Sequence, residues 1–68
     1  MNTTDEFVIH RAKRTNSGAY ILLCHLPGNE ITPWVTWYSE DITGSRRING
    51  NYFYSDEAAD AFKDFEER

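Results

Sequence analysis

The C-terminal segment limits the possible folds of this chain more than any other. In residues 55–68, Ala58, Phe62 and Phe65 recur at the spacing of one helical face, with Ala61 beside them. So narrow an apolar stripe has to be buried against a neighbouring layer of structure. Because the rest of the chain has strand-like patterns rather than helical ones, we predict that this helix lies on a β-sheet.

Four segments that favour β-structure precede the helix, at residues 7–14, 19–26, 33–38 and 46–54. Short turns rich in Gly, Asn, Pro and Ser separate the first three segments, and a polar connection at residues 39–44 leads to the fourth. Gly50 interrupts the fourth segment, which predicts a bulge or a close backbone approach. Ser55 follows directly, and we expect it to be the N-cap of the helix.

Together these segments predict an α+β fold. We expect a small antiparallel β-meander of three to four strands with one C-terminal α-helix packed on one face, in the order β-β-β-β-α. A chain of 68 residues forms one domain, 1–68, in which we expect residues 1–5 to be disordered. Two Trp, four Tyr and four Phe residues are expected to supply most of so small a core.

Few residues are suited to catalysis or metal binding. Cys24 is the one cysteine, which excludes an internal disulfide, and no metal-binding spacing is present. Cys24 and His25 are neighbours in a predicted strand, so their side chains point to opposite faces and cannot form a dyad. His10 could meet either of them across the first hairpin. We therefore expect no enzymatic activity, no cofactor and no metal.

The sequence contains no segment typical of a membrane-spanning or exported protein. No stretch approaches the length and apolarity of a membrane span. The N-terminus has neither the basic region nor the apolar run of a signal peptide. Together with a free thiol, these features lead us to expect a cytoplasmic protein.

Negative charge is concentrated in the predicted helix. The formal net charge of the chain is −4, and residues 55–68, with six acidic and two basic residues, account for all of it. The simplest interpretation is a solvated helix face. The alternative is an acidic surface that binds a basic partner.

Aromatic residues of the third and fourth strands form a second candidate surface. A sheet has two faces and one helix covers one of them, so we expect part of the Trp and Tyr set to lie exposed on an open face. The alternative is that the first hairpin packs back over these side chains and covers them. An open face would bind a protein, or a second copy of the chain as a homodimer. With the acids of the helix, the predicted partner-binding residues are Trp34, Tyr38, Tyr52, Tyr54, Asp56, Glu57, Asp60 and Asp64.

These observations predict a small acidic, non-enzymatic protein-interaction module. A sharper version is an inhibitor that competes for the basic groove of a host protein, such as a nuclease. The alternative is a weak nucleic-acid-binding module that uses open-face aromatics and five cations, namely Arg11, Lys13, Arg14, Arg46 and Arg47. That alternative requires the first and fourth strands to bring their cations together. Otherwise these charges serve to discourage aggregation between sheet edges.

A spaced pattern in the second half of the chain resembles a known group of proteins. Its residues are Val35-Thr36-Trp37, Asp41, Thr43-Gly44, Gly50-Asn51-Tyr52-Phe53, Asp64-Phe65 and Arg68. The pattern is similar to V-T-W, T-G, G-x-Y-F and D-F-x-x-R in small uncharacterised bacterial, plasmid and phage proteins. Asn51 stands where that group often has histidine, so any role of that histidine is lost or altered. The resemblance covers residues 35–68, and it implies this fold and a bacterial or mobile-element origin but no activity.

Overall fold

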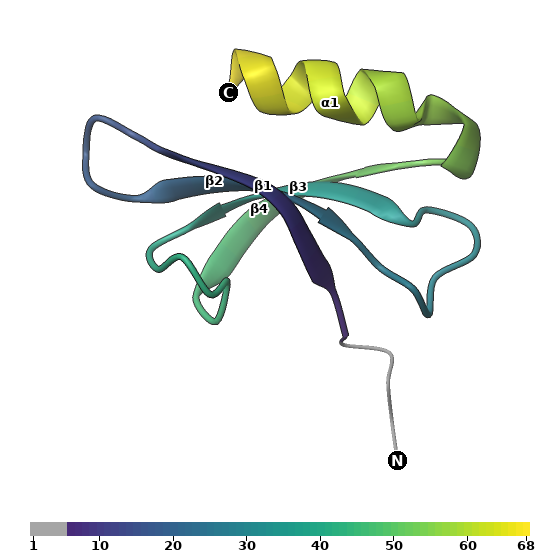
Figure 1. Cartoon of the computed structure of the whole chain (residues 1–68), viewed down its shortest axis with the longest axis horizontal. Coiled ribbons are helices and arrows are strands. Elements are labelled where there is room, and N and C mark those ends of the chain that lie inside the picture. The colour runs from purple at the N-terminus through teal and green to yellow at the C-terminus, as the bar shows by residue number, and fades with distance from the viewer. Residues whose placement is uncertain (1–5) are drawn as a thin grey trace.

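The computed structural model describes residues 6–68, so the disorder predicted for residues 1–5 falls outside the described part. The elements are β1 (Val8–Arg14), β2 (Tyr20–His25), β3 (Trp34–Ser39), β4 (Arg47–Phe53), the 3-10 turn η1 (Ser55–Glu57) and α1 (Ala58–Glu67). All neighbouring strands are antiparallel, in the order β1-β2-β3-β4. α1 lies across one side of this sheet (Figure 1). The predicted β-meander with one C-terminal helix is confirmed.

The helical segment begins one residue earlier than predicted. Ser55 lies inside η1, and Tyr54 precedes the first turn in an extended conformation, so the assignment of Ser55 as N-cap is wrong. The side chain of Glu57 reaches back instead, and its Oε1 accepts a hydrogen bond from the Tyr54 backbone N–H at 2.9 Å. This contact satisfies a backbone donor that the end of β4 would otherwise leave free.

The side of the sheet beneath α1 holds a first core. Ala61 and Phe65 are the buried residues of α1, and they pack on Ile21 and Leu23 of β2. The surrounding half-buried side chains are Trp34, Tyr38, Phe53 and Phe62. The small Ala61 allows close approach of the helix while the ring of Phe65 fills the space beside it. The predicted apolar stripe is therefore the buried face of the helix.

The opposite side of the sheet holds a second core and is not open. Its buried residues are Leu22, Cys24, Leu26, Val35 and Trp37, and Phe7, Ile9 and Tyr20 pack against them. The ring of Phe7, just before β1, meets Trp37 edge to face with centroids 5.3 Å apart. The guanidinium carbon of Arg47 lies 4.4 Å and 4.6 Å from the centroids of these two rings.

The connection between β3 and β4 completes this second core. Gly44 is buried, and a Cβ added to it would lie 3.0 Å from the Phe7 ring and 3.2 Å from Leu22. This connection and the start of β1 both lie on the side of the sheet away from α1 (Figure 1). The expected open face is therefore wrong, because one edge strand and one loop meet over it.

A bulge in β1 helps to bring that strand over the sheet. Cα partners run from Ile9 with Cys24 to Arg11 with Leu23, so two positions of β1 advance while β2 advances by one. Ile9 then packs in the second core while Arg11 lies on the helix side. Strict alternation would have placed both on the same side. Bulges bend a strand and increase its twist.

A second bulge lies in β4, where the pairing with β3 shifts between Thr36 and Tyr38. Asn49 takes a positive φ of 56° there. Gly50 is overlaid by the indole of Trp37, and a Cβ on it would lie 2.4 Å from the indole Nε1. The irregularity predicted at Gly50 is confirmed, since the strand both bulges and approaches a ring closely. No helix within residues 6–68 is long and apolar enough to cross a membrane.

Candidate functional site

The four aromatic residues predicted for one open face lie on different sides of the sheet. Trp34 and Tyr38 are half-buried in the core beneath α1. Tyr52 lies on the other side, where its ring meets that of Trp37 with centroids 6.2 Å apart. Tyr52 and Tyr54 are 50% and 57% exposed. The predicted set therefore does not form one surface, and Tyr52 and Tyr54 are its members open to solvent.

The free edge of β4 carries several exposed apolar side chains. Within the described chain, β4 pairs with β3 on one side and with nothing on the other. Ile48 is 52% exposed, and Tyr52 and Tyr54 follow at similar exposure along the same edge. No charged residue occurs between Arg47 and Asp56. Natural proteins protect edge strands with charges or with bulges. This edge lacks charges and carries one bulge, at Asn49 and Gly50.

Ile48 is the residue of this edge that sequence reasoning missed. Its Cα partner is Tyr38, which places it on the helix side, away from Gly50 and Tyr52. Strict alternation along the strand would place Ile48 on the same face of the sheet as Gly50 and Tyr52. The signal that could have found it is the uncharged run between Arg47 and Asp56.

Acidic side chains adjoin this edge where the chain turns into the helix. Asp56 and Asp60 are exposed, and Glu57 is half-buried where it binds the Tyr54 backbone. Within residues 6–68, the one ion pair joins Arg46 and Glu40 at 3.4 Å. The carboxylates of Asp56 and Asp60 therefore have no cationic partner among the described residues.

Asp64 is a structural tether rather than part of that acidic surface. Its Oδ2 accepts hydrogen bonds from the hydroxyl of Thr36 at 2.5 Å and from the amide of Asn51 at 3.2 Å. Arg68 donates from Nη1 to the carbonyl and hydroxyl oxygens of Thr36, each at 3.0 Å, and from Nη2 to the Asn49 carbonyl at 3.0 Å. Thr36 is fully buried. These contacts fasten the end of α1 to β3 and β4.

Several residues that carry the resemblance in the sequence belong to this tether. Thr36, Asp64 and Arg68 come from its first and last motifs, and they meet around one buried hydroxyl. The amide of Asn51 also donates to Asp64. In this chain these residues hold the helix on the sheet.

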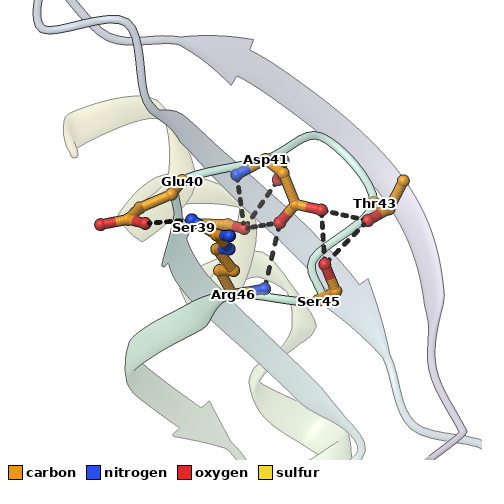
Figure 2. A network of polar contacts seen from close by, with 6 residues as sticks. All are labelled: Ser39, Glu40, Asp41, Thr43, Ser45 and Arg46. Carbon is orange, nitrogen blue, oxygen red and sulfur yellow. Dashed lines mark hydrogen bonds and ion pairs between the residues drawn. The ribbon is translucent and has the colours of Figure 1, made fainter.

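Asp41 organises the connection between β3 and β4 (Figure 2). Its carboxylate accepts hydrogen bonds from the hydroxyls of Ser45, Thr43 and Ser39 and from the backbone N–H of Arg46. These donors, led by Ser45 and Thr43, stabilise the ionised form and hold the pKa of Asp41 well below its usual range. The carboxylate shapes the loop that carries Gly44 into the second core.

The five cations of the nucleic-acid alternative do not converge. Arg11, Lys13 and Arg14 lie on β1, and Arg46 and Arg47 lie at the start of β4, on the opposite edge. Several of them already have partners within the chain. Lys13 Nζ donates to the Glu66 carbonyl at 2.9 Å, and Arg11 lies 5.6 Å from the centroid of the Phe62 ring. The structure therefore provides no single surface that holds all five cations.

Cys24 and the two histidines lie on different sides of the sheet. Cys24 is 0% exposed in the second core, and burial raises the pKa of its thiol to about 12 against the opposing effect of the Arg47 charge. His25 lies on the helix side, with its ring centroid 4.9 Å from that of Trp34 and 6.1 Å from that of His10. The predicted opposite orientations of Cys24 and His25 are confirmed. His10 meets His25, and the thiol is a protonated core group at neutral pH.

Comparison with known proteins gives no match, whether with protein-family models, curated proteins or solved structures.

Proposed function

We propose that this chain is a small non-enzymatic protein-interaction module whose contact surface is the free edge of β4. The observation that carries the proposal is the exposure of Ile48, Tyr52 and Tyr54, at 52%, 50% and 57%, along an edge with no charged residue between Arg47 and Asp56. The unpaired N–H and C=O groups of such an edge can accept a strand of another protein. Exposed tyrosines supply large contact area at the centre of many interfaces.

The acidic residues beside the edge favour a partner with a basic contact surface. Asp56 and Asp60 are exposed and have no cationic partner within residues 6–68. A basic groove on a host protein would supply the missing counter-charges, and the module would then act as its inhibitor. In this proposal the chain is encoded by a bacterium or a mobile element and works in the cytoplasm.

Two further observations support a non-enzymatic role. The thiol of Cys24 and the imidazole of His25 are separated by the sheet, so neither can activate the other. The larger surface hollow, of about 380 Å³, is lined by Glu6, Phe7, Val8 and Pro27. Among the described residues of that lining, Glu6 is the single titratable side chain, and general acid–base catalysis needs such a group within hydrogen-bond reach of a bound substrate.

Capture of partners by immobilised protein tests this proposal, with Ile48→Lys as the disruptive variant. Val8→Lys is the matched control, because Val8 is 51% exposed on the opposite edge strand and Ile48 is 52% exposed on β4. Bacterial lysate and a set of purified proteins with basic grooves are the two sources of partner. We expect the wild type and Val8→Lys to retain the same protein and Ile48→Lys to lose it, with circular dichroism verifying that all three fold.

Equal retention by all three proteins would contradict the assignment of β4 as the contact surface. Failure of the wild type to retain any protein, including itself, would contradict the interaction module.

The nucleic-acid alternative has weaker support, because its cations lie on opposite edges of the sheet. Titration of labelled single-stranded and duplex nucleic acid at about 50 mM salt, where phosphate contacts are strong, tests it. We expect no binding. A saturable signal that weakens steeply with salt would favour the alternative.

A further inference from the structure

We propose that β4 pairs antiparallel with β4 of a second copy of this chain, so that two sheets join edge to edge around a two-fold axis. This inference rests on the proposed function, because it names the occupant of the same edge. Three features of the chain point to it: the contrast between its two sheet edges, the charges at the two ends of β4, and the arrangement of the exposed apolar side chains.

The two edges of the sheet differ in charge. β1 carries Arg11, Lys13 and Arg14, so pairing of β1 with itself would bring like charges together. β4 has no charged residue between Arg47 and Asp56. Of the two edges, β4 is therefore the one that can accept another strand without opposing charges.

The charges that flank β4 have opposite signs at its two ends. Arg46 and Arg47 stand at the start of the strand, and Asp56 and Glu57 follow its end. Antiparallel pairing centred on Asn51, one residue past the middle of β4, places the start of one strand beside the end of the other. The cations of each copy then face the acids of its partner, whereas parallel pairing would place cation against cation and acid against acid.

Arg46 is the cation that is free to make this contact. Its side chain is 73% exposed, and its contact with the 63% exposed carboxylate of Glu40, at 3.4 Å, is a surface ion pair of small energy. Arg47, in contrast, lies over the rings of Phe7 and Trp37 and is held in the second core. The predicted contact therefore joins Arg46 of each copy to Asp56 of the other.

The exposed apolar side chains follow the same two-fold relation. Ile48 lies near the start of β4 and Tyr54 lies just past its end. Antiparallel pairing brings Ile48 of one copy close to the end of the strand in the other copy, where it loses solvent contact. Both β4 edges are then used, and the two basic β1 edges remain outermost, so association stops at two copies.

Association is expected to be weak and to depend on concentration. β4 has 7 residues, so the paired edge is shorter than those of stable interfaces, which bury about 1,600 Å² in total. The net charge of −4 on each copy opposes association when salt is low. Sedimentation at physiological salt, from micromolar to millimolar protein, covers the range in which such a dimer forms.

Charge reversal provides the decisive test. In Arg46→Glu, both contacts of the symmetric pair become acid against acid, and in Asp56→Arg both become cation against cation. We expect each variant alone to dimerise about tenfold more weakly than the wild type. An equimolar mixture of the two variants restores both opposite-charge contacts, so we expect it to associate nearly as well as the wild type. Val8→Lys should dimerise normally, and Ile48→Lys should remain monomeric.

A wild type that stays monomeric at millimolar concentration would overturn the inference, as would two charge variants that fail to associate when mixed. If Val8→Lys lost dimerisation and Ile48→Lys kept it, the dimer contact would lie on β1, and this result would also overturn the inference. A monomeric wild type that still retains another protein through Ile48 leaves the proposed function standing. If it retains nothing, both the inference and the proposed function fail.

Discussion

Asp41 illustrates how a single carboxylate stabilises a loop in this small protein. Its hydrogen bonds from Ser45, Thr43, Ser39 and the Arg46 backbone all favour the ionised form. The pKa of Asp41 is therefore lower in the folded protein than the value of about 3.9 expected in the unfolded chain. A lowered pKa stabilises the folded state at pH values above the unfolded pKa, and this contribution is lost as the pH falls below it.

We predict that Asp41→Asn lowers the free energy of unfolding at pH 7, where the wild-type carboxylate is ionised. The difference from the wild type should shrink as the pH is lowered from about 4 to about 2, because the carboxylate of the unfolded wild type then takes up a proton while that of the folded protein stays ionised, which favours unfolding of the wild type. Urea unfolding followed by circular dichroism at several pH values measures this. Glu40→Gln is the matched control, since Glu40 makes one exposed ion pair and its loss should have little effect. A difference that stays constant with pH would contradict the role given to Asp41.

Of the two bulges in the sheet, the sequence predicts the one in β4 and not the one in β1. The irregularity of β4 at Gly50 can be predicted from the sequence, because a glycine inside a strand usually marks a bulge or a close backbone approach. No glycine or proline marks the bulge between Ile9 and Arg11. Alternation along β1 is therefore misleading in the sequence, and the side of the sheet on which Arg11 lies could not be predicted.

At the scale of elements, the sequence predicts the apolar attachment of α1 and misses the polar one. Ala61 and Phe65 are found from the helical period alone, because periodicity states which helix face is buried. The bond from Thr36 to Asp64 joins residues far apart in the chain, and no local pattern indicates which strand residue a helix carboxylate will meet. The sequence therefore predicts Asp64 as part of the acidic surface, although its carboxylate binds Thr36 and Asn51 of the sheet.

We predict that Asp64 and Thr36 contribute to stability as a coupled pair. Asp64→Ala should destabilise the protein by about 1–3 kcal/mol, because the buried Thr36 hydroxyl loses its acceptor. Thr36→Val removes the same bond from the other side, so the double variant should cost less than the sum of the two single ones. Urea unfolding of the four proteins measures the coupling. Asp60→Ala, an exposed acid of the same helix, should change stability by less than about 0.5 kcal/mol, and additive single effects would contradict the tether.

At the scale of the whole molecule, the sheet has a core on each side, and this accounts for a stable fold of 68 residues with no internal disulfide. The continuous buried run from Ile21 to Cys24 in β2 is typical of a strand covered on both faces. The sequence shows this apolar run, but it does not indicate which elements cover the second face of the strand. Phe7 and Gly44 are far apart in the sequence but lie close together in the fold, and local sequence patterns do not predict such contacts.

Coverage of both faces also determines where a partner can bind. α1 covers one face, and the β3–β4 connection with Phe7 and Ile9 covers the other. Within residues 6–68, backbone groups therefore remain open to pairing at the two edges of the sheet. β1 is protected by cations and β4 is not. The proposed contact surface is therefore a consequence of the fold as a whole, rather than of any motif in the sequence.

Two cores that share one thin sheet should unfold together, and Cys24 can report this. Its thiol is 0% exposed in the second core and its pKa is raised to about 12, so a thiol reagent should react after unfolding and not before. We predict that Phe65→Leu, in the first core on the other side of the sheet, accelerates labelling of Cys24. This substitution should lower the free energy of unfolding by about 1–2 kcal/mol, which corresponds to labelling roughly tenfold faster when opening and closing are rapid.

Ile31→Ala, at a side chain that is 71% exposed, should leave the labelling rate unchanged. If Phe65→Leu lowered the helical circular dichroism signal without changing the reactivity of Cys24, the two cores would be separate units and the shared sheet would not couple them.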